Sequence, residues 1–170
     1  IQYFAETLIT IDGNHFYGQS SRSYGAYFNY LMGDSNYYDN LTLHIDGNEF
    51  IGMAWGGIYF NSQIYDFKHV SISLDGNTFL NPTGSMSYGV YFNNDIYYSN
   101  DAHDTSLSLS ISGNTGEEVY SAVYFSSNIY GFRDVSIDIN LNAFRNIVNQ
   151  WMNYGVYFSN DIFFGTDTYD

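Results

Sequence analysis

Apolar and polar residues alternate in a short segment that recurs five times along the chain. In each copy, two apolar residues stand five and three positions before an asparagine, with a polar residue between them. The apolar pairs are Ile9 and Ile11, Leu43 and Ile45, Ile72 and Leu74, Leu109 and Ile111, and Ile137 and Ile139. An alternation of period two is typical of a strand with one buried face, and it argues against an amphipathic helix.

A second recurring segment follows each copy of the first and ends in Tyr-Phe. Its copies are Gly25–Phe28, Gly57–Phe60, Gly89–Phe92, Ala122–Phe125 and Gly155–Phe158. Because successive side chains of a strand point to opposite faces, we expect the phenylalanines to face inward and the tyrosines outward. A third inward position is expected four residues after each phenylalanine, at Met32, Ile64, Ile96, Ile129 and Ile162.

The two segments together define a repeat of about 32 residues. The phenylalanines at 28, 60, 92, 125 and 158 are 32, 32, 33 and 33 residues apart. The spacing between the asparagines alternates between long and short, which indicates a duplicated two-coil unit. The predicted repeats are residues 7–40, 41–69, 70–106, 107–134 and 135–170.

Three short strands in each repeat predict an all-β, parallel β-solenoid of about five coils. A single coil cannot bury its apolar face, so coils stack and equivalent strands pair in parallel. Right-handed winding is expected, because parallel crossover connections are overwhelmingly right-handed. We expect the chain to be one stretch of a longer rod or filament, since both ends fall within a repeat.

The net charge and the composition of the chain limit the classes of partner that it can bind. Among the 170 residues, four Lys and Arg face 18 Asp and Glu, for a formal charge of −14, and there is no cysteine. Nucleic acid is therefore an unfavourable partner, because phosphate binding needs clustered basic residues. Disulfides and thiolate metal sites are excluded. No apolar run approaches the roughly 20 residues of a membrane-spanning helix.

Stacking would turn each repeated residue into a column along the solenoid. The asparagine column consists of Asn14, Asn48, Asn77, Asn114 and Asn142, and the sequence places it in a turn. Amides in such a column can hydrogen-bond from coil to coil, so we predict a structural ladder. A phenylalanine column at positions 16, 50, 79 and 144 is interrupted by Gly116 and is expected in the core.

The outward tyrosines predict an aromatic stripe. Its members are Tyr27, Tyr59, Tyr91, Tyr124 and Tyr157, flanked by Tyr65, Tyr97, Tyr130 and Phe163. Aromatic pairs between neighbouring strands stabilise sheets, so the stripe has a structural interpretation. Exposed aromatic stripes also mark binding surfaces, so a platform for sugar rings or a lateral contact between rods is the functional alternative.

Asp12, Asp46 and Asp75 share one position of the repeat, where Ser112 and Asn140 follow in later copies. Stacked carboxylates repel one another unless they are solvated, hydrogen-bonded, or bridged by a hard cation such as Ca²⁺. Both interpretations stay open from the sequence.

No catalytic constellation is evident in the sequence. The four histidines, at 15, 44, 69 and 103, occupy unrelated positions of the repeat. Their spacing does not match metal-ligand motifs. We therefore expect a protein that is not an enzyme and that has no cofactor other than the Ca²⁺ considered above.

The strand-and-turn segment Ile-x-Ile-x-Gly-Asn-x-Phe, followed by Gly-Val-Tyr-Phe, resembles right-handed parallel β-helix repeats of bacterial autotransporter and adhesin passenger domains. The resemblance covers nearly the whole chain. It implies an extracellular or bacterial cell-surface rod with structural and adhesive roles, whose partners are other copies of itself or host and matrix glycans. Two alternatives remain: a filament subunit that stacks head to tail, and a β-helix that binds or cleaves polysaccharides.

Overall fold

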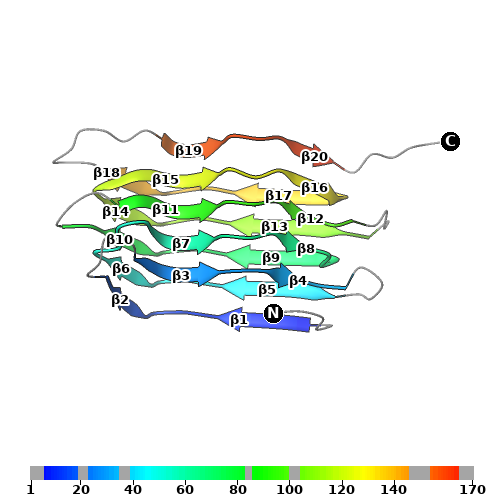
Figure 1. The fold of residues 1–170 in the computed structure, drawn as a ribbon, viewed down its shortest axis with the longest axis horizontal. Coiled ribbons are helices and arrows are strands. Elements are labelled where there is room, and N and C mark those ends of the chain that lie inside the picture. The colour runs from blue at the N-terminus through cyan, green and yellow to red at the C-terminus, as the bar shows by residue number, and fades with distance from the viewer. Residues whose placement is uncertain are drawn as a thin grey trace.

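The computed structural model describes residues 6–18, 23–34, 39–82, 86–99, 104–145 and 154–164. Within these residues the chain forms only short β-strands, turns and irregular segments, and all strand pairs are parallel. Equivalent strands of successive coils stack into four sheets of five strands each (Figure 1). The path from the first to the last strand of a sheet makes about four turns, which confirms the predicted parallel β-solenoid. Right-handed winding stays a prediction.

Each coil contributes one strand to each sheet. The first sheet consists of β1 (Glu6–Thr10), β5 (Asn40–His44), β9 (His69–Ser73), β13 (Ser106–Ser110) and β17 (Asp134–Asp138). The second consists of β2 (His15–Tyr17), β6 (Glu49–Ile51), β10 (Thr78–Leu80), β14 (Thr115–Glu117) and β18 (Ala143–Arg145). The third consists of β3 (Tyr24–Phe28), β7 (Gly56–Phe60), β11 (Met86–Phe92), β15 (Val119–Phe125) and β19 (Tyr154–Phe158). The fourth consists of β4 (Leu31–Met32), β8 (Ile64–Tyr65), β12 (Ile96–Tyr97), β16 (Ile129–Phe132) and β20 (Ile162–Phe164).

Two details differ from the sequence prediction. Each coil has four strands instead of three, because the residues after the asparagine turn form a short sheet of their own, which consists of β2, β6, β10, β14 and β18. In the first coil the third inward position is Leu31, which pairs with Ile64, whereas Met32 pairs with Tyr65. The first coil is one residue shorter between Phe28 and this strand, and Tyr30 takes a left-handed conformation there with φ of 60°. The inward residue of the first coil therefore lies three positions after the phenylalanine, instead of the predicted four.

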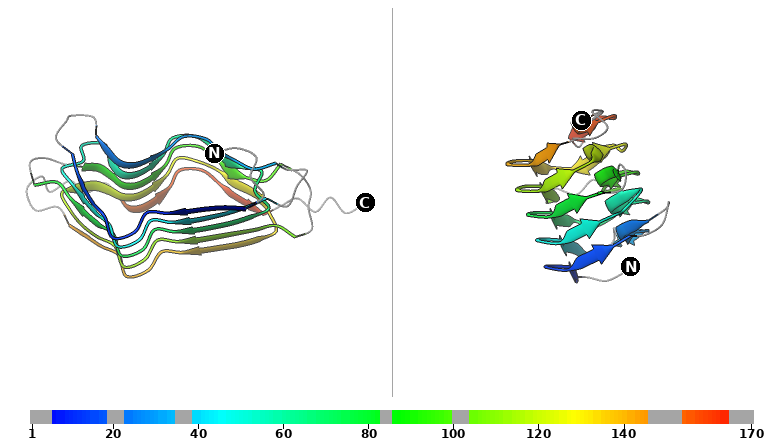
Figure 2. Two further views of the ribbon diagram at one scale, coloured as in Figure 1. Left: turned by 90° about the horizontal axis from the view of Figure 1, so that it is seen from below. Right: turned by 90° about the vertical axis from the view of Figure 1, so that its left-hand side faces the viewer.

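The coil is flattened, so that the first sheet lies across the core from the third and fourth sheets (Figure 2). Phenylalanines of the third sheet stack along the axis, with ring centroids 4.4 Å apart for Phe60 and Phe92 and 4.6 Å apart for Phe92 and Phe125. The aliphatic residues of the first sheet are equally buried, as at Leu43 and Ile72. These continuous apolar columns form the core that holds the coils together.

Close packing requires glycine where the second and third sheets meet. A Cβ atom at Gly25 would lie 2.0 Å from Cδ1 of Phe50, and one at Gly57 would lie 2.2 Å from Cε1 of Phe79. The phenylalanine column of the second sheet thus packs directly against the glycine column of the third, which explains why the Tyr-Phe segment begins with glycine.

Candidate binding surface

The asparagine column forms a continuous hydrogen-bonded ladder. The Oδ1 of each asparagine accepts the backbone N–H of the asparagine one coil earlier, at 2.9 Å from Asn14 to Asn48 and 2.8 Å from Asn77 to Asn114. Its Nδ2 donates to a carbonyl of the preceding coil, at 2.7 Å from Asn77 to Ile45 and 2.6 Å from Asn142 to Ile111. The amides are used to join coils, which leaves few polar groups for a ligand.

The three aspartates form a similar ladder at the adjacent turn position. Oδ1 of Asp12 accepts the N–H of Asp46 at 3.0 Å, and Oδ1 of Asp46 accepts the N–H of Asp75 at 2.7 Å. The hydroxyl of Ser73 donates to Asp46 at 2.8 Å, and the hydroxyl of Ser110 donates to Asp75 at 2.8 Å.

The hydrogen bonds favour the hydrogen-bonded interpretation of these carboxylates over a calcium site. Calcium sites in proteins need six to eight oxygen ligands, whereas the oxygens of Asp46 and Asp75 face N–H and O–H donors. In the part of the chain that the structure describes, no group of three or more His, Asp or Glu side chains could hold a metal ion.

The predicted tyrosine stripe lies on the outer face of the third sheet as an unbroken row of ring contacts. Ring centroids are 5.6 Å apart for Tyr27 and Tyr59, 4.9 Å for Tyr59 and Tyr91, and 5.3 Å for Tyr91 and Tyr124. Tyr27 is 48% exposed, whereas Tyr59 is only 7% exposed. Neighbouring rings therefore cover much of the stripe itself.

Two further sets of aromatic residues on this sheet were missed from the sequence. Tyr24, Tyr88 and Tyr154 stand four residues before the phenylalanine in the first, third and fifth coils, and Gly56 and Ser121 take that position in the coils between. The rings of Tyr24 and Tyr59 are 4.7 Å apart, and those of Tyr88 and Tyr124 are 5.5 Å apart. A search for residues shared by every second repeat would have found this row.

The second missed set consists of Trp55 and Tyr120, which are 41% and 40% exposed. Each stands directly before the small residue of its coil, Gly56 or Ser121, and these two residues both pair with Tyr88. We call the combined surface the aromatic face. It comprises Tyr24, Tyr27, Trp55, Tyr59, Tyr88, Tyr91, Tyr120, Tyr124, Tyr154 and Tyr157.

The aromatic face is uncharged at neutral pH. Burial, followed by the proximity of Tyr91, raises the pKa of Tyr59 and of Tyr88 above the ordinary tyrosine value. Burial also raises the pKa of Tyr97 and Tyr130, which stack on the fourth sheet with centroids 4.9 Å apart. The phenols are thus weak acids suited to hydrogen bonding and apolar contact. The side chain of Phe163, predicted to flank the stripe, lies outside the described residues.

The structure also brings together a polar cluster that the sequence did not reveal. His69 and Ser106 are register partners on β9 and β13, with 2.9 Å between His69 Nδ1 and Ser106 Oγ. Asp104 Oδ2 lies 3.9 Å from His69 Nε2 and 2.9 Å from Lys68 Nζ. The hydrogen bond from Lys68 lowers the pKa of Asp104.

This cluster resembles a serine–histidine–aspartate triad in composition only. A triad needs a carboxylate hydrogen-bonded to the histidine to fix its tautomer and orientation, and here Asp104 is held by Lys68 instead. The neighbouring backbone N–H groups of β13 are paired within the sheet, so they supply no oxyanion hole. Of the remaining histidines, His15 contacts Glu49, His44 contacts Asp46, and His103 lies outside the described residues.

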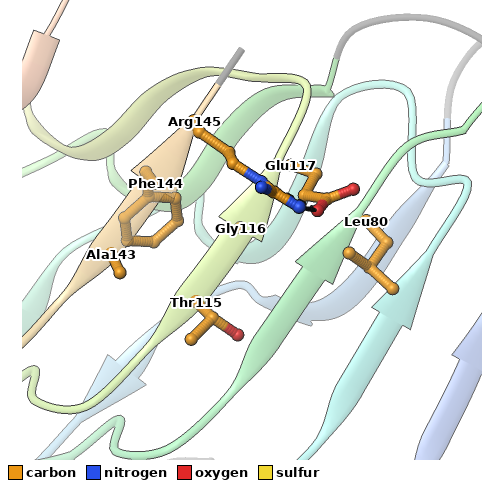
Figure 3. A pocket seen from close by; sticks show the side chains of 7 residues that line it. All are labelled: Leu80, Thr115, Gly116, Glu117, Ala143, Phe144 and Arg145. Carbon is orange, nitrogen blue, oxygen red and sulfur yellow. Dashed lines mark hydrogen bonds and ion pairs between the residues drawn. The ribbon is translucent and has the colours of Figure 1, made fainter. Parts of the chain in front are cut away.

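A hollow of about 420 Å³ opens beside β10, β14 and β18 (Figure 3). It lies where the phenylalanine column is interrupted by Gly116, next to the ring of Phe144. Nε of Arg145 donates to Oε1 of Glu117 at 2.9 Å at its edge, so the two charges there neutralise each other. Among the described residues that line the hollow, Glu117 and Arg145 are the titratable ones.

No protein-family model, curated protein or solved structure matches this chain. In the described residues, no helix has the length and apolar character required to cross a membrane.

Proposed function

We propose that this protein is a non-enzymatic, rigid β-helical rod at the bacterial cell surface or outside the cell, where it holds adhesive aromatic contacts at fixed positions. The observation that supports this most is that the asparagine and aspartate columns bond from one coil to the next, as from Asn48 to Asn77 and from Asp75 to Ser112. Because the repeated polar side chains form hydrogen bonds between coils, they favour a role as a scaffold over a role in catalysis.

The charge supports a role in contact with solvent. A formal charge of −14 keeps rods soluble and apart from one another. The side chains of the aromatic face do not contribute to this charge. We therefore assign the adhesive contacts to this surface. The resemblance to autotransporter and adhesin passenger repeats agrees with this role.

Immunolabelling of the organism that makes the protein tests the proposed location. Antibodies against the folded chain should label intact cells as strongly as permeabilised ones, with an antibody against a cytoplasmic protein as the control. Labelling that appears only after permeabilisation contradicts the proposal.

A filament subunit is the second candidate, favoured by apolar exposure on the last coil. Val156, Phe158 and Ile162 are 43%, 36% and 37% exposed, although their equivalents Val123, Phe125 and Ile129 are fully buried. An open solenoid end is also a template for another strand.

Electron microscopy of the purified chain tests the filament. Head-to-tail stacking should give polar filaments that disappear in the variant Val156→Lys, whereas the exposed control Leu8→Lys on the outer face should keep them. Discrete particles at all concentrations contradict this candidate.

A further inference from the structure

The aromatic face contains the same group of four rings twice. The first two coils supply Tyr24, Tyr27, Trp55 and Tyr59, and the next two coils supply Tyr88, Tyr91, Tyr120 and Tyr124. Equivalent rings meet in both groups, although at different angles: the Tyr24 and Tyr27 centroids are 5.1 Å apart with ring planes at 55°, and those of Tyr88 and Tyr91 are 4.3 Å apart at 22°. The ring planes of Tyr24 and Tyr59 make an angle of 58°, and those of Tyr88 and Tyr124 make an angle of 63°. The two-coil duplication therefore repeats the positions of the aromatic residues as well as the fold.

One position is exposed in both groups, that of Trp55 and Tyr120; Tyr27 is 48% exposed, but its equivalent Tyr91 is only partly exposed. Trp55 and Tyr120 are exposed almost equally, at 41% and 40%, whereas Tyr59 and Tyr124 at the next column are largely covered by neighbouring rings. The coils before and between them carry Ser23 and Ser87 at this column, so Trp55 and Tyr120 are separated by a small residue. Each exposed ring is thus a platform with no second aromatic residue next to it in its column.

The spacing of these platforms is set by the sheet. Trp55 and Tyr120 belong to strands two positions apart, and two strand spacings along the axis amount to about 10 Å. In an extended β-1,4-linked polysaccharide each sugar is turned over relative to its neighbour, so equivalent ring faces recur once every disaccharide. The length of that disaccharide is comparable to two strand spacings. Helical α-linked chains do not repeat in this way.

The net charge of the protein determines which of these polysaccharides it can bind. The chain carries a formal charge of −14 with only four basic residues, so it repels polyanions such as uronic acid polymers. The aromatic face offers apolar rings and phenol hydroxyls; that of Tyr91 donates to Oδ1 of Asn93 at 2.8 Å, and its oxygen can still accept a hydrogen bond. This combination suits a neutral sugar chain, which presents both C–H faces and hydroxyl groups.

We propose that the aromatic face binds a neutral, extended β-1,4-linked polysaccharide along the rod axis, with every second sugar ring resting on Trp55 or Tyr120. The inference rests on the adhesive role proposed above and names its ligand. Two platforms in line mean that affinity grows with chain length until both are covered.

Titration calorimetry with neutral oligosaccharides tests the inference. Cellohexaose and chitohexaose are the two probes of the required geometry, and binding of either supports the proposal and identifies the sugar. Maltohexaose, an α-linked chain, and a hexamer of galacturonic acid should not bind. Cellobiose and chitobiose should bind at least tenfold more weakly than the hexamers, because they reach a single platform (about tenfold per 1.4 kcal/mol).

Variants then assign the binding to the two rings. Trp55→Ala and Tyr120→Ala should each weaken hexamer binding about tenfold, since each removes one aromatic contact. Tyr120→Phe keeps the ring and should bind nearly as the parent does. Tyr17→Ala is the matched control, because Tyr17 is 68% exposed but lies on β2 in the second sheet.

The inference would be overturned by no binding of either β-1,4-linked hexamer, by equal binding of maltohexaose, or by hexamer binding unchanged in the double variant Trp55→Ala/Tyr120→Ala. Self-association through these rings, seen by sedimentation as a dimer that the double variant loses, would also overturn it in favour of a second copy of the chain. Immunolabelling of intact cells is independent of sugar binding, so failure of the ligand and failure of the surface role are distinguishable.

Discussion

At the scale of single residues, the fourth coil departs from the repeat at two positions that compensate each other. Gly116 stands where other coils have phenylalanine, and Ala122 stands where other coils have glycine. Phe144 of the fifth coil leans toward the missing ring, so that a Cβ at Gly116 would lie 2.4 Å from its Cδ1. The methyl group of Ala122 is accommodated, and it is only 2% exposed. Part of the volume lost from the column is thus filled by its neighbours, and the hollow beside β14 lies at the same place.

Adjacent glycines on β7 provide a sharp test of this packing. Gly57→Ala should lower the free energy of unfolding by about 1–3 kcal/mol, because its Cβ would lie 2.2 Å from Phe79. Gly56→Ala should change it by less than about 0.5 kcal/mol, because its nearest neighbour is at 3.6 Å. Urea unfolding measures both, and equal losses in the two variants would contradict the account.

The aspartate ladder leads to a prediction about metal removal. Since Asp46 and Asp75 accept N–H and O–H donors, we expect EDTA to leave the melting temperature unchanged. Ser73→Ala, which removes a hydroxyl donor shared by both carboxylates, should lower the free energy of unfolding by about 1 kcal/mol. Differential scanning calorimetry with and without EDTA decides the matter, and a lower melting temperature in EDTA would restore the calcium interpretation.

At the scale of elements, the third sheet differs from the others because both of its faces carry aromatic columns. Phe92 and Phe125 stack on the inner face at 4.6 Å, and Tyr91 and Tyr124 meet on the outer face at 5.3 Å. Cross-strand aromatic pairs stabilise a sheet. The outer rings therefore support the coil packing even where they also form a binding surface.

This sheet should make the protein sensitive to alkali. Burial raises the pKa of Tyr59, Tyr88 and Tyr124 in the folded chain, so the unfolded chain loses these protons first as the pH passes about 10. The stabilisation is complete below that pH and is lost as the pH rises through the higher folded values. Melting temperatures should therefore fall above pH about 10, together with the appearance of tyrosinate absorbance on unfolding.

Tyr88→Phe is the control for this titration, because it keeps the ring and removes one ionising hydroxyl. Its melting temperature should fall less steeply with pH than that of the parent. Parallel pH profiles for the two proteins would show that Tyr88 does not contribute.

At the scale of the whole molecule, burial falls from the middle coils to the ends. Val70 and Ile72 on β9 are 2% and 1% exposed, whereas Val135 and Ile137 on β17 are only partly buried. Each coil contacts only its neighbours, so an end coil has half the stacking of a middle one. Stability is consequently uneven along the rod.

Hydrogen exchange should reveal this gradient. Amides of β9 and β13 should exchange slowest, and those of β17 and β18 fastest, with the difference following the loss of one neighbouring coil. Mass spectrometry of peptides from each coil measures it. Protection of the last coil equal to that of the middle would contradict open ends in the dissolved monomer.

The sequence by itself determined the solenoid, because a period-two alternation repeated at about 32 residues leaves stacking as the way to bury each apolar face. Tyr27 and its equivalents could be placed on the outer face from alternation alone. The same reasoning named the asparagine and aspartate columns, because residues at one position of a repeat must stack.

The tertiary structure determined which residues of different columns lie next to one another and which of them make contacts. It turned Leu31 inward in place of Met32, brought His69 to Ser106, and set Trp55 and Tyr120 on either side of Ser87. These relations depend on register and on turn conformation, such as the left-handed residue Tyr30, which hydrophobic periodicity does not specify. A repeat fixes which residues share a column, but only folding fixes the distances between columns.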